Sequence, residues 1–229
     1  MASKVLVKDY PAFGGPEFSF VASDGHEAGP TDEGEYRVAN CGRHSSKRYP
    51  TWSKIPWGTQ LRDDGGTIMV LFEGRWRPLS EIVTLTRAEI VEYHYQLYRT
   101  RIVPSTWVFN DFGHVTCFLY KDRNRNRRRD ADEPIHGEFI HTTPMNEAQS
   151  DQKLHQPVIL EESHGCIHLK PVDIDDMIRR GYMRKNALVV VHRYVDRRIV
   201  IPRGIGHAPF EIHFFPGMKQ LMVLGAREY

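Results

Sequence analysis

Short apolar runs of strand length, separated by glycine-rich and polar stretches, recur along this 229-residue chain. Residues 67–72 and 188–192 are continuous apolar runs rich in β-branched side chains, which predicts buried strands. Phe18 and Phe20 alternate with polar neighbours, which predicts a half-buried strand, and residues 107–109 form another strand-like run. This pattern predicts a mostly β domain, and the chain is long enough to bury a core without metal or disulfide support.

Two helices are expected within this pattern. Thr86 and Glu89 have the spacing of a capping box, so we predict a helix that starts there and ends near residues 98–101. A shorter helix is predicted over residues 172–180, with Gly181 at its C-cap position. The chain is therefore expected to be mostly β with short helices.

The C-terminal part has a hairpin pattern. Residues 211–215 and 220–224 flank a Pro216–Gly217 turn. We therefore divide the chain into a main domain, residues 1–193, and a C-terminal extension, residues 194–229, whose hairpin packs on it.

Charge and cysteine content narrow the classes of function. Lys and Arg total 31 against 29 Asp and Glu, and a net charge of +2 gives no reason to expect nucleic acid as a partner. The three cysteines, Cys41, Cys117 and Cys166, are widely spaced and form neither a disulfide framework nor a zinc-ribbon pattern. At least one thiol is expected to be free or to pair outside the chain.

Two features bear on location. No apolar run approaches the roughly 20 residues that a membrane span needs, and the first residues lack the apolar core of a secretory signal. We expect a protein that works in the cytosol, has lost a signal, or leaves the cell by a route that needs none.

The most informative stretch is residues 163–169, Ser-His-Gly-Cys-Ile-His-Leu. The N–H groups of Gly165 and Cys166 could form an oxyanion hole, and the Cys166 thiol needs a neighbouring base to act as a nucleophile. The candidate bases are His141, His155, His164 and His168. A small, buried, inert cysteine in a His-rich turn is the alternative that the local sequence leaves open.

This stretch resembles the Ser-His-Gly-Cys signature of the L,D-transpeptidase (YkuD-type) catalytic domain. Residues 139–144, Phe-Ile-His-Thr-Thr-Pro, are similar to the upstream histidine segment of that family, and residues 31–38 resemble its early Thr-Pro-x-Gly-x-Tyr strand, with Asp32 in place of Pro. The resemblance spans roughly residues 4–193 and makes the main domain the catalytic one. It implies a β-sandwich or barrel with a Cys loop, to which this chain adds an inserted helix and the C-terminal hairpin.

The resemblance implies a peptidoglycan-modifying cysteine enzyme without a cofactor. Cys166 would attack the carbonyl of the third stem-peptide residue, release D-Ala and form a thioester, with His141 as the base and His164 and Gly165 beside them. An amine acceptor would give a 3-3 cross-link, a free D-amino acid an exchange, and water an L,D-carboxypeptidase. The expected substrate-binding residues are Ser163, Thr142, His168 and Tyr36, although Ser163 could support the loop and Tyr36 could belong to the core.

Three departures from the family pattern stand out. His168 replaces the usual Arg or Asn, which affects how the loop is oriented. The stretch from His141 to Ser163 is long, which predicts an enlarged loop over the substrate. The stretch between Tyr36 and His141 is also long and holds the capped helix, which could be a lid or a partner surface.

Two sets of residues contain side chains that can bind a metal. His141, His164, Cys166 and His168 could in principle bind zinc, but their spacing is not a usual zinc pattern. The other candidate has oxygen side chains at calcium-loop positions one, three, five, nine and twelve, namely Asp122, Asn124, Asn126, Asp130 and Glu133. Arg127 stands where such a loop has glycine, five arginines crowd the loop, and its flanks are strand-like. A solvated hairpin loop, or a basic loop that contacts anionic cell-wall polymers, are the alternatives.

Several functions remain open at this stage. The expected substrate is the peptidoglycan stem peptide, and the expected place of action is the periplasm or cell wall. A housekeeping enzyme and a secreted antibacterial effector, with secretion machinery and an immunity protein as partners, fit equally well. A hydrolase or amidase on the same fold, and a peptidoglycan-binding module with a dead site, are further alternatives. A conventional Cys/His peptidase fits less well, since its cysteine normally precedes its histidine.

Overall fold

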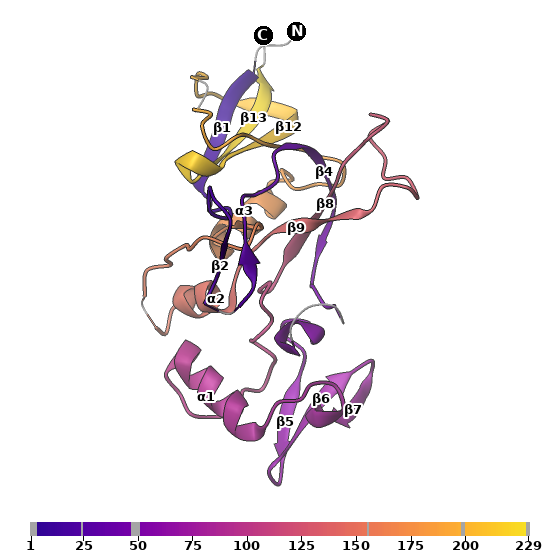
Figure 1. The fold of residues 1–229 in the computed structure, drawn as a ribbon, viewed down its shortest axis with the longest axis vertical. Coiled ribbons are helices and arrows are strands. Elements are labelled where there is room, and N and C mark those ends of the chain that lie inside the picture. The colour runs from indigo at the N-terminus through magenta and orange to yellow at the C-terminus, as the bar shows by residue number, and fades with distance from the viewer. Residues whose placement is uncertain (1–3, 24, 47–50, 155, 198–199, 228–229) are drawn as a thin grey trace. The chain divides into compact units, whose positions relative to one another are not determined.

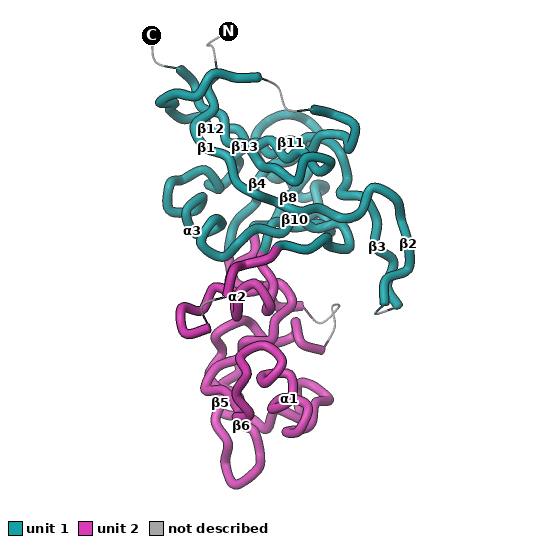
Figure 2. The backbone as a smooth tube through the Cα atoms, turned by 90° about the vertical axis from the view of Figure 1, so that its left-hand side faces the viewer, with its two compact units in different colours: residues 1–41, 117–141, 160–229 teal, residues 42–116, 142–159 magenta. Residues whose placement is uncertain are grey.

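The computed structural model of the protein describes residues 4–23, 25–46, 51–154, 156–197 and 200–227 (Figure 1). The chain forms two compact units, which Figure 2 colours separately. Unit 1 contains residues 1–41, 117–141 and 160–229, and unit 2 contains residues 42–116 and 142–159. The chain therefore leaves unit 1 twice, after Cys41 and after His141.

Unit 1 is built on a mixed eight-stranded sheet. Its strand order is β1(Lys4–Pro11), β13(Gln220–Arg227), β12(Gly206–Phe215), β11(Leu188–Val191), β4(Gly34–Gly42), β8(Thr116–Tyr120), β9(Ile135–His141), β10(Ile167–His168). The pairs β11–β12 and β9–β10 are parallel, whereas β1–β13, β12–β13 and β4–β11 are antiparallel. The mostly β class predicted from the sequence is confirmed.

The C-terminal hairpin belongs to this sheet. β12 and β13 flank a short 3₁₀ turn (Pro216–Met218), which confirms the predicted hairpin. β13 pairs with β1, so the two ends of the chain share one edge of the sheet (Figure 1). Leu6, Phe215, Met222 and Leu224 form a buried cluster there, and apolar burial is the main force that holds such a hairpin in place. The domain boundary at residue 193 stays a prediction.

The helix α3(Pro171–Arg179) follows β10 and confirms the second predicted helix. Its apolar side is buried through Ile174 and Met177, and the Tyr10 hydroxyl on β1 donates to Asp176 at 2.8 Å. Gly181 has φ +74°, the left-handed conformation expected just after a helix. The helix is thereby fixed immediately after the cysteine-containing segment.

The predicted strand at Phe18 and Phe20 is wrong in its burial. β2(Phe20–Val21) pairs only with β3(Glu27–Ala28), and the two phenylalanines are 78% and 53% exposed. Alternation with polar neighbours therefore marks a short exposed ribbon here.

Unit 2 has its own core. The antiparallel strands β5(Leu61–Asp64), β6(Thr67–Phe72) and β7(Arg75–Pro78) precede α1(Arg87–Tyr98), and α2(Pro144–Ser150) completes the unit, with short 3₁₀ turns at Thr51–Lys54 and Leu79–Glu81. The strand predicted over residues 67–72 and the Thr86–Glu89 capping box are both confirmed. α2 was not predicted from the sequence. The buried cluster of this unit is entirely its own: Ile55, Leu61, Ile68, Val70, Leu79, Val83, Ile90, Leu97, Trp107, Phe109 and Ala148.

Trp107 and Phe109 are buried and Val108 is partly buried, but residues 107–109 do not form the predicted strand. Trp107 exchanges backbone hydrogen bonds with Gly58 and Thr59, and its indole N–H donates to the Trp52 carbonyl at 2.9 Å. An apolar run of three residues predicts burial, but here its backbone partners lie in a loop.

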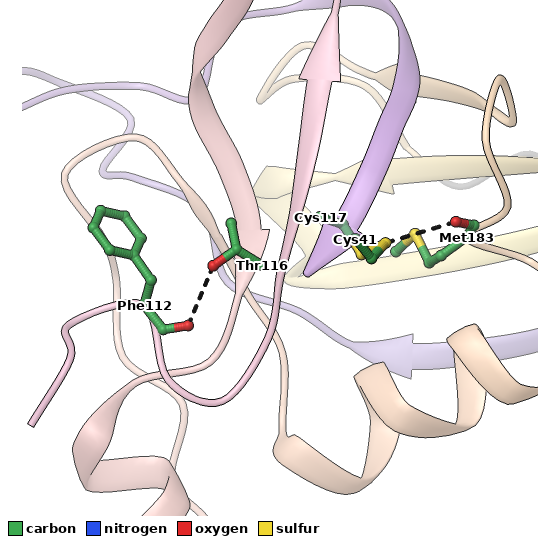
Figure 3. The surroundings of a disulfide bond; sticks show 5 residues. All are labelled: Cys41, Phe112, Thr116, Cys117 and Met183. Carbon is green, nitrogen blue, oxygen red and sulfur yellow. Dashed lines mark hydrogen bonds between the residues drawn. A yellow bond between two sulfur atoms is a disulfide. The ribbon is translucent and has the colours of Figure 1, made fainter. Parts of the chain in front are cut away.

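A disulfide links Cys41 on β4 to Cys117 on β8, the strand next to β4 (Figure 3). Its Cα atoms are 4.0 Å apart, and Cys41 Sγ lies 3.6 Å from the Met183 carbonyl oxygen. The wide spacing of the cysteines did not predict this link. It joins the points where the chain leaves unit 1 for residues 42–116 and where it returns.

No helix in the described part of the chain is long and apolar enough to cross a membrane.

Candidate active site

Cys166 lies at the end of a turn, directly before β10, in what we call the Cys loop, residues 161–166. β10 runs parallel to β9 with Ile167 opposite Ile140 and His168 opposite His141. The Phe139 N–H, one step earlier on β9, points to Cys166 Sγ at an N···S distance of 3.4 Å. Taken as a whole residue, Cys166 is partly exposed, although its thiol is shielded by its surroundings.

The other side of the Cys loop is held by residues 13–15. His168 and Phe13 exchange backbone hydrogen bonds of 2.7 and 3.1 Å, and the Ser163 N–H donates to the Gly14 carbonyl at 2.9 Å. A Cβ atom on Gly15 would lie 1.9 Å from the Gly29 carbonyl oxygen, so only glycine permits this approach. The loop is thus supported on both sides by backbone.

Ser163 stabilises the turn through two hydrogen bonds of its side chain. Its buried hydroxyl accepts the Gly165 N–H at 2.9 Å and donates to the Cys166 carbonyl at 2.5 Å. Gly165 has φ +143°, which favours glycine. The Gly165 N–H is therefore already in use. It could serve as the expected oxyanion donor only if its hydrogen bond to Ser163 were broken.

The thiol rests in its protonated form. Cys41 and Cys117 are paired, so Cys166 is the one free cysteine of the three. Burial raises the pKa of the Cys166 thiol to about 12, the Phe139 N–H lowers this pKa, and the nearby Glu138 carboxylate raises it. Glu138 is a site residue that the sequence did not indicate, because its proximity depends on the β9–β10 pairing.

His141 ends β9 and is buried, with its ring 4.8 Å from the ring of His168, centroid to centroid. The β9–β10 register pairs His141 with His168, and Cys166 lies two positions before His168 on the neighbouring segment.

His168 has a defined tautomer. Its Nδ1 lies 3.0 Å from the Glu161 carbonyl oxygen, which can only accept, so Nδ1 carries the hydrogen and Nε2 is left as an acceptor. Burial lowers the pKa of His168 to about 4. This residue is therefore neutral at physiological pH and supports the loop from the position where the family has Arg or Asn.

The family comparison agrees with this geometry. The family model for the L,D-transpeptidase (YkuD) catalytic domain matches residues 3–191 of the 229. The chain belongs to the L,D-transpeptidase catalytic domain family. A search of curated proteins and a search of solved structures each returned no match.

Membership of the L,D-transpeptidase family accounts for the mostly β fold and for a peptidoglycan-modifying activity. The Ser-His-Gly-Cys signature of the family lies in the Cys loop, directly before β10.

Two of the expected substrate-binding residues lie in the interior. Tyr36 is 1% exposed, donates to the Asp32 carbonyl at 3.0 Å and packs its ring against His136. Thr142 is fully buried and donates to the Glu147 carboxylate. Both side chains are hydrogen-bonded within the fold, and their contact with substrate stays a prediction.

The remaining histidine candidates differ in accessibility. His164 is exposed, and its ring lies 6.5 Å from that of His26. Its carbonyl accepts the Gly29 N–H at 3.4 Å, so the backbone shapes the loop while the side chain remains accessible. His155 lies outside the described residues.

One group near the Cys loop has the composition of a metal site. One ligand atom each from Asp32, His136 and Glu138 lies within 4.8 Å of the others. Among the described residues, the set His141, His164, Cys166 and His168, whose spacing already argued against zinc, does not form such a group.

A surface hollow of about 380 Å³ lies in unit 1 beside this acidic group. Asp32, on its wall, donates its N–H to Glu138 at 2.9 Å, and Glu138 approaches Gly165. Asp32 and Glu138 therefore link the wall of the hollow to Gly165 in the Cys loop. Its lining is Pro30, Thr31, Asp32, Glu33, Arg193, Tyr194 and Val195.

Proposed function

We propose that the protein forms a thioester between Cys166 and a peptidoglycan stem peptide and transfers the acyl group to an amine, either for 3-3 cross-linking or for D-amino-acid exchange. Family membership supports the reaction class. The observation that carries the residue assignment is the free Cys166 thiol two positions before His168, whose ring contacts that of His141.

The first half-reaction breaks the bond before the terminal D-Ala. Cys166 Sγ attacks the carbonyl carbon of the third residue while His141 takes the thiol proton. The tetrahedral intermediate collapses, the C–N bond breaks, and His141 returns the proton to the departing amine of D-Ala. The product is an acyl-thioester.

The second half-reaction releases the enzyme. An acceptor amine attacks the thioester carbonyl, a C–N bond forms and the C–S bond breaks. The amine proton passes through His141 to the departing sulfur, so the resting thiol is restored. Water in place of the amine would give the tripeptide and an L,D-carboxypeptidase.

The resting protonation state favours general-base catalysis over a preformed thiolate. A thiol pKa of about 12 leaves the thiolate almost unpopulated at neutral pH. The proton must therefore leave during the attack, which requires a base within reach of the sulfur. His141 is the proposed base, and Ser163 is a positioning residue that fixes the turn.

The proposed place of action is the periplasm or cell wall. The Cys41–Cys117 disulfide supports this, because disulfides persist in oxidising compartments. The antibacterial effector role stays a prediction. Growth arrest on expression in the periplasm but not in the cytosol of a test bacterium would favour it.

The test of the reaction is incubation of the purified protein with disaccharide-tetrapeptides, read by mass spectrometry. Loss of D-Ala with dimer formation is the expected result, and a new terminal residue when a D-amino acid is added would identify exchange. Tripeptide alone would make the protein a carboxypeptidase. Cys166→Ala is expected to remove all of these products, and turnover that survives this substitution would refute the proposal.

A further inference from the structure

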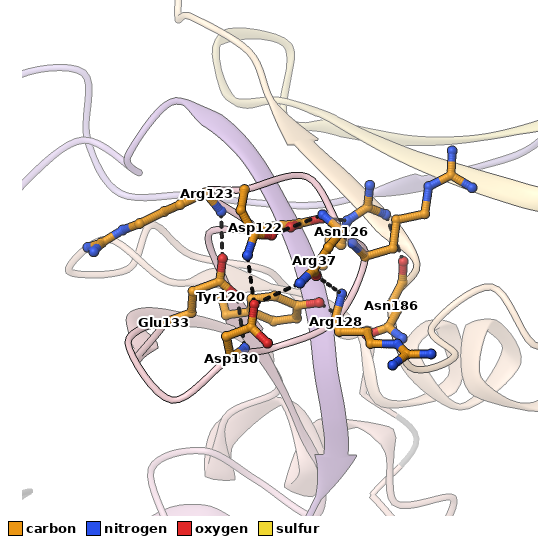
Figure 4. A network of polar contacts seen from close by, with 11 residues as sticks. Arg37, Tyr120, Asp122, Arg123, Asn126, Arg128, Asp130, Glu133 and Asn186 are labelled. Carbon is orange, nitrogen blue, oxygen red and sulfur yellow. Dashed lines mark hydrogen bonds and ion pairs between the residues drawn. The ribbon is translucent and has the colours of Figure 1, made fainter.

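The connection between β8 and β9 contains the one sequence pattern that the proposed chemistry does not use. Residues 122–133 have oxygen side chains at the calcium-loop positions. Figure 4 shows four of them, Asp122, Asn126, Asp130 and Glu133, in one polar network beside Arg37 and Tyr120. The whole loop belongs to unit 1.

Three of these side chains meet at one point. Asn124 Nδ2 and Asn126 Nδ2 both donate to the same oxygen of Asp130, Oδ2, each at 2.7 Å. The oxygens of these two amides accept the N–H groups of Asn126 at 3.0 Å and Arg128 at 2.7 Å, and each oxygen keeps a second lone pair for an ion. Two amide oxygens and a carboxylate oxygen could thus face a common centre.

The backbone takes the path that such a loop requires. Arg125 and Arg127, at loop positions four and six, have φ +60° and +62°. Position six is where a calcium loop places its glycine for a sharp turn. The arginine that seemed to oppose this pattern therefore adopts the glycine conformation.

The carboxylate of Asp122, at loop position one, provides evidence that does not depend on the loop geometry. Its side chain is 6% exposed. Oδ2 accepts the Arg127 N–H at 3.0 Å and pairs with Arg37 Nε at 2.5 Å, so the carboxylate faces the loop. The other oxygen, Oδ1, is buried and has no hydrogen-bond partner among the described residues. Buried polar atoms are nearly always satisfied, so this oxygen indicates a missing ligand.

Glu133 stands at position twelve, where a calcium loop has its bidentate carboxylate. It is 1% exposed, and its carboxylate accepts the N–H groups of Arg123 at 2.7 Å and Asp130 at 3.0 Å. These bonds hold the two ends of the loop together.

From these observations we propose that Asp122, Asn124, Asn126, Asp130 and Glu133 form a calcium site that ties β8 to β9. An all-oxygen ligand set favours a hard cation, and a flexible loop favours Ca²⁺ over Mg²⁺, which requires a near-ideal octahedron. β9 presents the Phe139 N–H to Cys166 and ends at His141, so the ion would brace the strand that carries the candidate base.

The charge balance indicates weak binding. Arg37 already neutralises part of the Asp122 charge, and the five arginines of the loop raise the local positive potential. These five residues are exposed, so water and salt screen their charges in part. We expect a dissociation constant of roughly 10⁻⁴ to 10⁻³ M, the range of extracellular calcium modules.

The test is calorimetric titration of Ca²⁺ into the metal-free full chain, with thermal unfolding measured beside it. Asp130→Asn is expected to weaken Ca²⁺ binding at least tenfold, because one ligand charge is lost at nearly constant shape. Asp132→Asn is the matched control, since it removes the same charge from an exposed position of the same loop that supplies no ligand. Binding to this control is expected to match the wild type.

Asn124→Ala provides a second variant whose exposed side chain can be removed without leaving a buried charge. Weaker binding by both ligand variants, with Mg²⁺ producing no comparable thermal shift, would support the site. No heat and no thermal shift of the wild type at about 10 mM Ca²⁺, or binding by Asp130→Asn equal to the wild type, would overturn it.

Discussion

At the residue scale, the reactivity of the Cys166 thiol depends on opposing neighbours. The Phe139 N–H stabilises the thiolate, whereas burial and the Glu138 carboxylate oppose it. Glu138 is held close because its carboxylate accepts the Asp32 N–H and lies against Gly165. The charge of Glu138 therefore helps to keep the thiol protonated until a base removes the proton.

Glu138→Gln should lower the pKa of Cys166, because it removes the negative charge and keeps the size of the side chain. We expect severalfold faster alkylation of Cys166 by iodoacetamide at a fixed pH of about 8, where the thiolate fraction rises as the pKa falls. The pH dependence of the alkylation rate measures this. Glu162→Gln removes an exposed carboxylate of the same loop and should leave the rate unchanged. An unchanged rate in Glu138→Gln would contradict the electrostatic role.

At the element scale, α1 illustrates how local sequence can specify a helix boundary. Thr86 Oγ1 accepts the Glu89 N–H at 3.2 Å, and the Glu89 carboxylate accepts the Thr86 N–H at 2.7 Å. Both partners lie three residues apart, so the sequence alone contains the whole motif.

Thr86→Ala should lower the free energy of unfolding by about 1 kcal/mol, because the first turn of α1 loses its side-chain cap. Urea unfolding followed by circular dichroism measures the difference. Thr84→Ala is the matched control, since Thr84 is exposed and precedes the helix. Equal losses in the two variants would show that the capping box does not stabilise α1.

The features predictable from the sequence are those with local causes. The helix α1, the C-terminal hairpin and the Ser-His-Gly-Cys turn each depend on residues a few positions apart. The parallel β9–β10 pairing, the position of Glu138 beside the thiol and the Cys41–Cys117 bond depend on residues 27 to 76 positions apart. Tyr36 shows what the sequence could not decide. A tyrosine that lines a substrate groove and a tyrosine that packs in a core look the same in the sequence, and only the fold shows that Tyr36 is buried.

At the scale of the whole molecule, one covalent link secures the longest excursion of the chain. The Cys41–Cys117 disulfide has a sequence separation of 76 residues and spans the segment of unit 2 that contains most of its core. The bond therefore closes the loop of residues 42–116 at its base.

Replacement of both Cys41 and Cys117 by Ala should destabilise the protein by about 4 kcal/mol, since the unfolded chain regains the entropy of a large closed loop. Denaturant unfolding of the double variant measures this loss. Cys166→Ala is the control that removes a cysteine without opening the loop. A double variant as stable as this control would show that the disulfide contributes nothing.

The stability of the molecule should also fall in acid. Burial lowers the pKa of His44 to about 4, below its value in the unfolded chain. As the pH falls from about 6.5 towards 4, the unfolded state takes up a proton first, so the stability present above pH 6.5 is progressively lost, by up to about 3 kcal/mol for this residue. His168 acts in the same direction.

Urea unfolding at about pH 7 and about pH 4.5 tests this pH dependence. His44→Gln should lose less stability between the two conditions than the wild type does. His26→Gln, at an exposed position, should behave like the wild type. The same acid loss in His44→Gln as in the wild type would rule out His44 as a source of the acid sensitivity.

The central claim is that Cys166 carries the acyl group. The most direct measurement is an acid quench of the protein during turnover of disaccharide-tetrapeptide, followed by intact-mass and peptide mass spectrometry. The account predicts an adduct of the substrate without its D-Ala, located on the peptide that contains Cys166, removed by hydroxylamine and absent from Cys166→Ala. Turnover without any adduct on that peptide, and undiminished in Cys166→Ala, would contradict it.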